Sequence, residues 1–234
     1  MKISIILPTK NQEKTIVKFI NQILNGLKNL EFELIVVCNG CSDRTYEKCK
    51  KIGKKIKLVN LKESGKGLAV LKGFEFSTGN IVGFVDSDGS YGIKTIKKVL
   101  NHIIENNYDV LIGSRWKDKK FFEVKEKFER KVFSRIWSFL VNLFLNLRLK
   151  DTQAGIKFFR RKVIESINLN FITKNYAFDV ELLLKIKLKH FFINEISVEP
   201  DIPSSSALSL VNVFNMLISL IKIWYNYILR KRGD

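Results

Sequence analysis

Cysteine and histidine are scarce in this chain of 234 residues, which holds three cysteines and two histidines. The cysteines are odd in number and crowded between residues 38 and 49, which argues against a disulfide framework and fits a reducing compartment. Cys38 and Cys41 have the spacing of a zinc-binding pair, but no second Cys or His pair follows them. His102 and His190 both lie in helix-like runs, so no histidine-based catalytic dyad is evident.

Long uninterrupted apolar runs are also missing. The apolar stretch near the N-terminus, Ile3–Leu7, is too short for a signal peptide and predicts a first β-strand instead. No segment comfortably supplies the ~20 apolar residues that a membrane-spanning helix needs. We therefore expect a cytoplasmic protein.

Acidic residues are few, with 23 Asp and Glu against 41 Lys and Arg, and the formal net charge is +18. Such an excess predicts an anionic partner, which is nucleic acid, an anionic membrane surface or a phosphorylated ligand. The aromatic residues are mostly phenylalanines inside apolar runs, without the interleaved aromatic and basic residues that stack on bases. We therefore expect no nucleic-acid partner. The chain is 46% hydrophobic, which is enough for a folded core.

The first half of the chain alternates short β-branched apolar runs with helix-like stretches. This rhythm is typical of βαβ units, and it predicts an α/β fold with a mostly parallel sheet flanked by helices. Ligands of such sheets bind outside the carboxyl ends of the strands. The predicted strands are Ile3–Leu7, Glu33–Val37, Ile56–Leu61, Ile81–Val85 and Asp109–Ile112.

Two segments of the second half predict helices with a narrow polar stripe and a broad apolar face, about 130–149 and 208–229. Basic residues flank both, and Trp137 and Trp224 are candidate interfacial anchors. Two interpretations stay open: the helices lie in a membrane interface, or they pack as ordinary core. Across the linker-like Pro200–Ser206 we expect one domain over 1–206 and a C-terminal amphipathic helix over 207–234.

Two carboxylates, Asp86 and Asp88, follow the predicted strand Ile81–Val85 directly. Residues i and i+2 project the same way from an extended chain, so both side chains can converge on one cation. Mg²⁺ or Mn²⁺ is usually held by one or two carboxylates together with substrate phosphate oxygens. The two carboxylates therefore predict the protein ligands of a metal site at the carboxyl edge of the sheet, with substrate oxygens as the other ligands.

A glycine-rich turn, Glu63–Ala69, opens a helix after the third predicted strand and contains Lys66. It is not a Walker motif, which needs GxxxxGK[ST]. The glycines and the helix N-terminus are suited to a phosphate, with Lys66 adding charge, or the glycines simply allow close packing of the helix.

Several segments together resemble glycosyltransferase family 2, and in particular its polyprenyl (dolichyl) phosphate glucosyltransferases and mannosyltransferases. The first half carries ISIILPTKNQ, ELIVVCNGCSDRT, GKGLAVLKGF, FVDSDGS and LIGSRW, in the order of the family. Further along, DTQAGIKFFRR and YAFDVELLLKI are similar to the glucosyltransferase branch. The resemblance implies a GT-A fold, a nucleotide-sugar donor, Mg²⁺ or Mn²⁺, and a polyprenyl or dolichyl phosphate acceptor at the cytoplasmic face of a membrane, with the protein peripherally associated.

The resemblance also implies roles for individual residues. Carried over by position, they are Pro8, Thr9, Asn11, Asn39, Lys66 and Asp86 for the nucleotide, Asp86 and Asp88 for the metal, Arg115, Arg130 and Ser134 for the acceptor phosphate, and Asp151, Thr152 and Gln153 for the sugar. Among these, Asp86, Asp88, Arg115 and Arg130 are the residues on which catalysis is expected to depend.

The chain departs from the family pattern at three places. Gln12 replaces a usual glutamate, Cys38-Asn39 replaces an acidic pair, and Ser90 stands where some relatives have a third metal ligand. UDP-glucose is the favoured donor because of DTQAGIKFF and AFDVELL, with GDP-mannose or an inactive relative as alternatives. The implied reaction is an inverting transfer that needs no general base, because a phosphate monoester with a second pKa of about 6 is already mostly dianionic.

Overall fold

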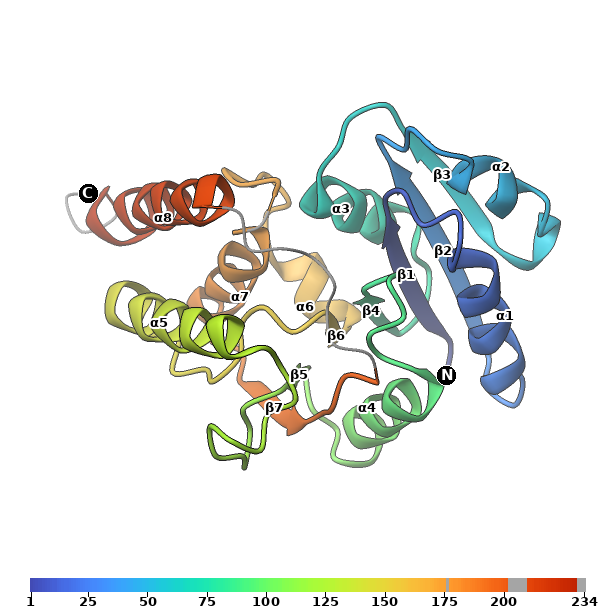
Figure 1. Cartoon of the computed structure of the whole chain (residues 1–234). Helices are drawn as coiled ribbons and strands as arrows, with labels where there is room; N and C mark the ends of the chain where they lie inside the picture. Colours follow the sequence, from blue (N-terminus) through green and yellow to red (C-terminus); the bar gives the residue numbers. More distant parts are fainter. Residues whose placement is uncertain (176, 202–209, 231–234) are drawn as a thin grey trace.

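A computed structural model of the chain describes residues 1–175, 177–201 and 210–230. Its centre is a seven-stranded sheet in the order β3-β2-β1-β4-β6-β5-β7 (Figure 1). The strands are β1 (Ile3–Thr9), β2 (Phe32–Asn39), β3 (Lys57–Leu61), β4 (Ile81–Val85), β5 (Val110–Ser114), β6 (Ile156–Arg160) and β7 (Ile193–Ser197).

The sheet is mostly parallel, as predicted. β1 pairs in parallel with β2 and β4, β2 with β3, and β5 with β7, whereas β6 lies antiparallel between β4 and β5. The five predicted strands are confirmed with small shifts, such as the continuation of β1 to Thr9. β6 and β7 were not predicted. Because β6 runs antiparallel, its start at Ile156 lies beside the end of β4 at Val85.

Helices cover both faces of the sheet (Figure 1). Successive residues of β1 point to opposite faces, with Ile5 in one core cluster and Ile6 in the other. The cluster around Ile5 includes residues of α1 (Ile16–Gly26), α2 (Thr45–Lys50) and α4 (Ile93–Glu105). The cluster around Ile6 includes residues of α3 (Lys66–Phe76), α5 (Phe128–Leu145), α6 (Arg161–Ser166), α7 (Phe178–Leu188) and α8 (Leu210–Trp224). Gly53–Lys55 forms a 3-10 turn, and Tyr225–Leu229 forms a π-helical turn, η2.

The helix predicted over about 130–149 is α5, which begins earlier and ends earlier. It ends at Leu145 because Asn146 adopts the left-handed conformation, with φ of 50°. Leu147 and Leu149 are buried outside the helix, so the apolar pattern continues where the helix does not. Trp137 is also buried, at 2% exposure, which contradicts its predicted role as an interfacial anchor.

The predicted C-terminal helix is present as α8 and η2. Met216, Leu220 and Ile223 are buried in the core. Trp224 packs edge to face against Phe144 of α5, with 5.6 Å between the ring centroids. Residues 202–209 and 231–234 lie outside the described part of the chain, so the predicted linker and domain boundary stay predictions. No helix among the described residues is both long enough and apolar enough to cross a membrane.

Candidate functional site

The loops at the carboxyl edge of the sheet are joined by buried hydrogen bonds. The Ser87 hydroxyl donates to the Pro8 carbonyl at 2.9 Å, which joins the end of β4 to the end of β1. The Asn39 amide donates to the Thr9 carbonyl at 2.9 Å and accepts from the Gly65 N–H at 3.1 Å. The segments that follow β1, β2, β3 and β4 therefore form one connected floor.

Asn39 replaces the acidic residue expected from the family pattern, and its environment explains the amide. The side chain is buried and uses both a donor and an acceptor, and an aspartate has no N–H to donate to Thr9. Asn11, at φ of 51°, joins the same edge through Ser42, whose backbone N–H it accepts at 2.9 Å. The nucleoside contacts predicted for these residues stay predictions.

Asp86 and Asp88 lie in the loop that directly follows β4, beside these connected segments. The Asp86 N–H donates to the Gly155 carbonyl at 2.8 Å, and the Asp86 carboxylate occupies the space that a Cβ on Gly155 would fill. Asp88 accepts the Ser90 N–H at 2.9 Å, so its carboxylate is oriented by its own loop. Asp86 therefore packs against Gly155, and Asp88 follows it in the loop after β4.

The donor set fits a hard divalent cation only in part. Asp86 and Asp88 offer carboxylate oxygens, which Mg²⁺ and Mn²⁺ prefer, and both side chains are half-buried. Among the described residues no group of three or more His, Cys, Asp or Glu gathers as a metal site. The two carboxylates thus suit a cation whose remaining ligands come from substrate oxygens and water.

A lysine already contacts Asp86, one of these two carboxylates. Lys66 Nζ lies 2.8 Å from Asp86 and 3.5 Å from Asp179, and the fully buried Lys157 lies 2.7 Å from Asp179. Burial raises the pKa of Asp86 against the opposing effect of Lys66, and the nearby carboxylates of Asp88 and Asp179 add to the rise. The result is a row of alternating charges running inward from the site. Asp179 thus pairs with two lysines.

The glycine-rich turn before α3 serves packing. The Gly67 N–H donates to the Lys174 carbonyl at 2.9 Å, and a Cβ on Gly67 would lie 2.7 Å from the Phe178 ring. The Gly65 N–H is used by Asn39. These backbone amides are thus engaged within the protein, and Lys66 reaches the site with its side chain.

Arg115 follows β5 and is clamped by Asp151. Its Nε donates to Asp151 Oδ2 at 2.8 Å and its Nη2 to Oδ1 at 3.0 Å, and Asp151 is 1% exposed. Burial alone would raise the pKa of Asp151, but Arg115 outweighs burial and the net shift is downward. Asp151 was predicted to border the sugar; the structure places its carboxylate against Arg115.

The other two predicted acceptor residues lie close to Arg115. Glu126 is between both arginines, 3.4 Å from Arg115 and 3.6 Å from Arg130. Ser134 accepts the indole N–H of Trp116, the residue after Arg115, at 2.9 Å. Arg115, Arg130 and Ser134 are thus brought together, and Glu126 is a member of the cluster that sequence reasoning missed.

Thr152 and Gln153 follow Asp151, which pairs with Arg115, and precede Gly155, which packs against Asp86. Thr152 Oγ1 and Gln153 Nε2 are buried and have no hydrogen-bond partner within the protein, so both atoms can bond to a water molecule or a ligand. Their segment ends at Gly155 against Asp86. Burial raises the pKa of the Tyr91 hydroxyl, and the positive charge of Arg115 opposes the rise.

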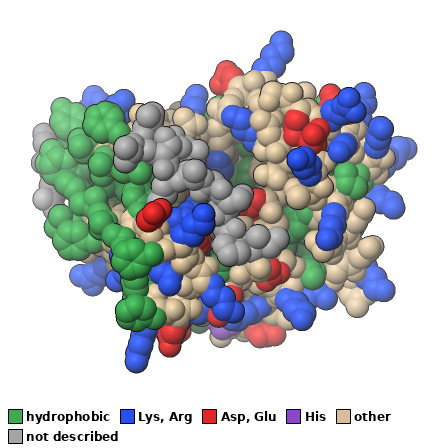
Figure 2. Space-filling model, in the orientation of Figure 1, with side chains coloured by type: hydrophobic (Ala, Val, Ile, Leu, Met, Phe, Trp, Pro, Cys, Tyr) green, Lys and Arg blue, Asp and Glu red, His purple; other side chains and the backbone are tan. Residues whose placement is uncertain are grey.

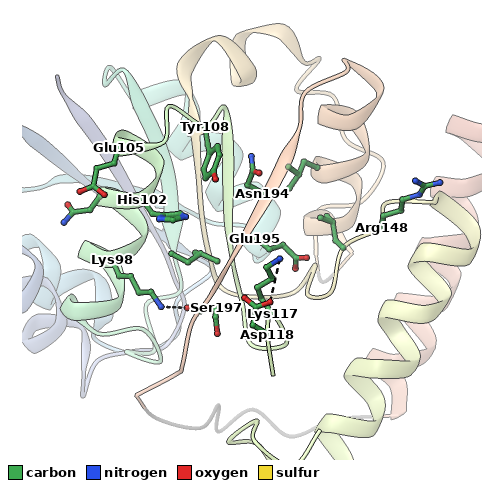
Figure 3. A pocket seen from close by; sticks show the side chains of 14 residues that line it. Lys98, His102, Glu105, Tyr108, Lys117, Asp118, Arg148, Asn194, Glu195 and Ser197 are labelled. Atoms are coloured by element: carbon green, nitrogen blue, oxygen red, sulfur yellow. Dashed lines mark hydrogen bonds and ion pairs between the residues drawn. The ribbon is translucent and has the colours of Figure 1, made fainter. Parts of the chain in front are cut away.

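A cavity of about 910 Å³ runs along the outer edge of β7, away from these carboxylates. Figure 3 shows Lys98 and His102 of α4 on one side of the strand and Arg148 on the other. Its link to the site is Glu195, whose carboxylate accepts the Asp151 N–H at 3.0 Å. Glu195 supports the turn that presents Asp151 to Arg115, a contact 44 residues apart that no local pattern signals.

An apolar surface lies over α5 and α8 at the left of the molecule (Figure 2). On α5, Phe139 is 65% exposed and Leu143 is 63% exposed, and on α8 Phe214 is 64% exposed. Contiguous apolar patches of this kind mark interaction sites. We call these residues, with Ile136, Ile218, Ile221 and Tyr225, the apolar face. Each helix also packs into the core, as the second interpretation predicted, and the membrane-interface interpretation stays a prediction.

The model of the family described as glycosyl transferase family 2 matches residues 4–167, which include the carboxylate pair, both arginines and the 151–155 segment. The chain belongs to glycosyl transferase family 2. This glycosyltransferase is 28% identical over 236 residues to dolichyl-phosphate beta-glucosyltransferase ALG5D of Trichomonas vaginalis, covering 94% of the chain and 72% of that protein. It is 32% identical over 193 residues to dolichol-phosphate mannosyltransferase of Pyrococcus furiosus, covering 80% of the chain and 53% of that protein.

The fold agrees with solved glycosyltransferases. Glucosyl-3-phosphoglycerate synthase from Mycobacterium tuberculosis, in complex with Mn²⁺, UDP and phosphoglyceric acid, superposes with a TM-score of 0.72 at 19% identity, covering 96% of this chain and 78% of that one. This likeness confirms the GT-A-type fold of the glycosyltransferase. The chain spans 38% to 72% of the length of three curated relatives it matches.

Proposed function

We propose that this glycosyltransferase moves a hexose, with UDP-glucose as the favoured donor, to a polyprenyl or dolichyl phosphate at the cytoplasmic surface of a membrane. The observation that carries the proposal is the position of α5. Its first turn holds Arg130, which forms the arginine cluster together with Arg115 and Glu126. Further along the same helix, Phe139 and Leu143 are exposed. One helix can thus meet an acceptor's phosphate and its lipid surroundings together.

The arrangement suits two anionic substrates side by side. Asp86 and Asp88 would hold Mg²⁺ or Mn²⁺, which supplies positive charge against the leaving diphosphate. Lys66 is placed to contact the same diphosphate, since it already reaches Asp86 at 2.8 Å. The relatives named for glucosyl and mannosyl transfer to dolichyl phosphate, and the neighbour solved with Mn²⁺ and UDP, support this assignment.

The chemistry follows from positioning. An oxygen of the acceptor phosphate forms the new bond to the anomeric carbon, and the bond to the diphosphate breaks with its electron pair leaving on the nucleotide. The acceptor, with a second pKa of about 6, is mostly dianionic at neutral pH and needs no base. Two side chains that could in principle act as a base agree with this. The Asp179 carboxylate pairs with two lysines, and His102 lines the cavity along β7.

Donor choice is tested by thermal unfolding in the presence of nucleotide sugars with Mg²⁺ or Mn²⁺. A ligand that binds only the native state raises its stability, by about 3 kcal/mol at a hundred times its Kd. We expect UDP-glucose to raise Tm only when the cation is present, and to support transfer to a polyprenyl phosphate. Transfer from GDP-mannose alone would replace the donor assignment, and absence of transfer from any donor would favour an inactive relative.

The apolar face predicts peripheral binding to anionic membranes. Its residues recur at helical spacing on α5 and α8, and the chain carries a net charge of +18. Basic residues near an anionic bilayer each add about 1 kcal/mol of attraction. Deleting α8 is a poor test, because Met216, Leu220 and Ile223 belong to the core.

Point variants on the face provide the test. Phe139→Glu and Leu143→Glu together are expected to lower flotation with phosphatidylglycerol-containing liposomes by at least about tenfold, because each large apolar side chain contributes roughly 1.5–3 kcal/mol when fully buried. Phe76→Glu is the matched control, since Phe76 is 44% exposed at the end of α3, next to Lys57 of the edge strand β3. Equal flotation of the wild type and the double variant would remove the membrane role of this face.

A further inference from the structure

Lys66 and a divalent cation compete for the same carboxylate. Lys66 Nζ lies 2.8 Å from Asp86 Oδ1, one of the two side chains that would hold the metal. Two like charges cannot share that oxygen at contact distance without strong repulsion. A cation that binds Asp86 therefore has to displace the ammonium group or bear its repulsion.

Asp86 has little room to turn away from the lysine. Its carboxylate fills the space beside Gly155, where an added Cβ would lie 2.0 Å from Oδ2, and its N–H is fixed to the Gly155 carbonyl. Lys66 has more freedom, since its ammonium group sits on a flexible four-carbon chain and its second contact, with Asp179, is longer at 3.5 Å. Asp179 keeps Lys157 at 2.7 Å whatever Lys66 does. Of these charged side chains, Lys66 is therefore the one that can move.

We infer that Lys66 acts as an internal counter-ion that keeps free divalent cations off Asp86 until a nucleotide diphosphate draws the lysine away. The inference rests on the proposed function, because it needs the metal and the nucleotide to meet at this site. In the donor complex the diphosphate offers Lys66 a new anionic partner while it supplies oxygens to the cation. The cation and the nucleotide then bind as a coupled pair, and each raises the affinity for the other by the same factor.

The test measures Mn²⁺ binding by electron paramagnetic resonance, with and without UDP, and requires no turnover. In the wild type, UDP is expected to tighten Mn²⁺ binding by at least about tenfold. Lys66→Met keeps the length of the side chain and removes its charge, so it is expected to bind Mn²⁺ alone about tenfold more tightly and to lower the coupling to UDP by about the same factor, leaving the coupling that comes from direct contact between the cation and the diphosphate. Lys72→Met is the matched control, because Lys72 lies on the same helix and pairs with the exposed Glu75.

Lys66→Arg separates charge from shape. It keeps the positive charge and is expected to bind Mn²⁺ alone as weakly as the wild type, with thermal unfolding confirming that each variant is folded. If Lys66→Met binds Mn²⁺ no more tightly than the wild type, or Lys66→Arg binds as tightly as Lys66→Met, the inference is wrong while the proposed function stands. If no form binds Mn²⁺ even with UDP, the metal assignment of Asp86 and Asp88 fails together with the inference.

Discussion

Replacing Asp86 by asparagine is expected to reduce hexose transfer by about a thousandfold, which corresponds to about 4 kcal/mol of lost transition-state stabilisation. Asparagine has nearly the same shape, so the contact with Gly155 is kept while the charge that would hold the cation is lost. Lys66 still has Asp179 at 3.5 Å, so the cluster keeps an ion pair. The measurement is the rate of transfer from the nucleotide sugar to a polyprenyl phosphate across a range of Mn²⁺ concentrations.

Asp118→Asn is the matched control for this loss of charge. Asp118 is 70% exposed and lies 3.9 Å from Lys117 on the loop after β5, away from the carboxylate pair. It is expected to leave the rate and the metal dependence unchanged. An Asp86→Asn variant with the wild-type rate and the same requirement for Mn²⁺ would show that Asp86 does not hold the catalytic cation.

The parallel half of the sheet was predictable because its strands are apolar and end in polar loops. β1 is buried along its whole length, and β4 passes from buried Val85 directly to Asp86. For such strands the rule that ligands bind at the carboxyl ends places the site without knowledge of the contacts. Pro8, Asn39 and Arg115, whose roles the family resemblance implies, agree with this rule, since each lies at or directly after the end of a strand.

The antiparallel strand β6 was not predictable, because a charged residue interrupts it. Lys157 is the second residue of Ile156–Arg160 and is fully buried, which apolar patterns do not anticipate. Its partner Asp179 lies 22 residues later on α7. The end of α5 was misplaced for a related reason: Leu147 and Leu149 are buried in non-helical chain and extend the apolar pattern beyond the helix.

The same limit applies to the arginine cluster. Arg115, Arg130 and Ser134 were placed by their positions in the motifs, but the acidic residues that orient them come from distant segments. Asp151 reaches Arg115 across 36 residues, and Asp151 is itself supported by Glu195 of β7. The family motifs therefore pointed to which side chains gather, and the tertiary structure shows which carboxylates hold them.

Arg115→Lys is expected to have the second large effect, on both stability and catalysis. Lysine cannot reproduce the two parallel bonds from Nε and Nη2 to Asp151, so one oxygen of a side chain that is 1% exposed loses its partner. We expect a loss of about 3 kcal/mol in the free energy of unfolding, measured by urea denaturation. We also expect a rise of about tenfold in KM for the polyprenyl phosphate, with KM for the nucleotide sugar unchanged.

A double-mutant cycle with Asp151→Asn separates these two effects. If Arg115 only buttresses Asp151, the activity cost of Arg115→Lys should largely disappear once the carboxylate is gone, because the pair then has nothing left to lose. If Arg115 also contacts the acceptor phosphate, Arg115→Lys should still raise the acceptor KM in the Asp151→Asn background. Only the second outcome agrees with the proposed acceptor site. In the Asp151→Asn background the buried ion pair is already broken. Any remaining effect of Arg115→Lys on the acceptor KM therefore reports a contact between Arg115 and the acceptor phosphate.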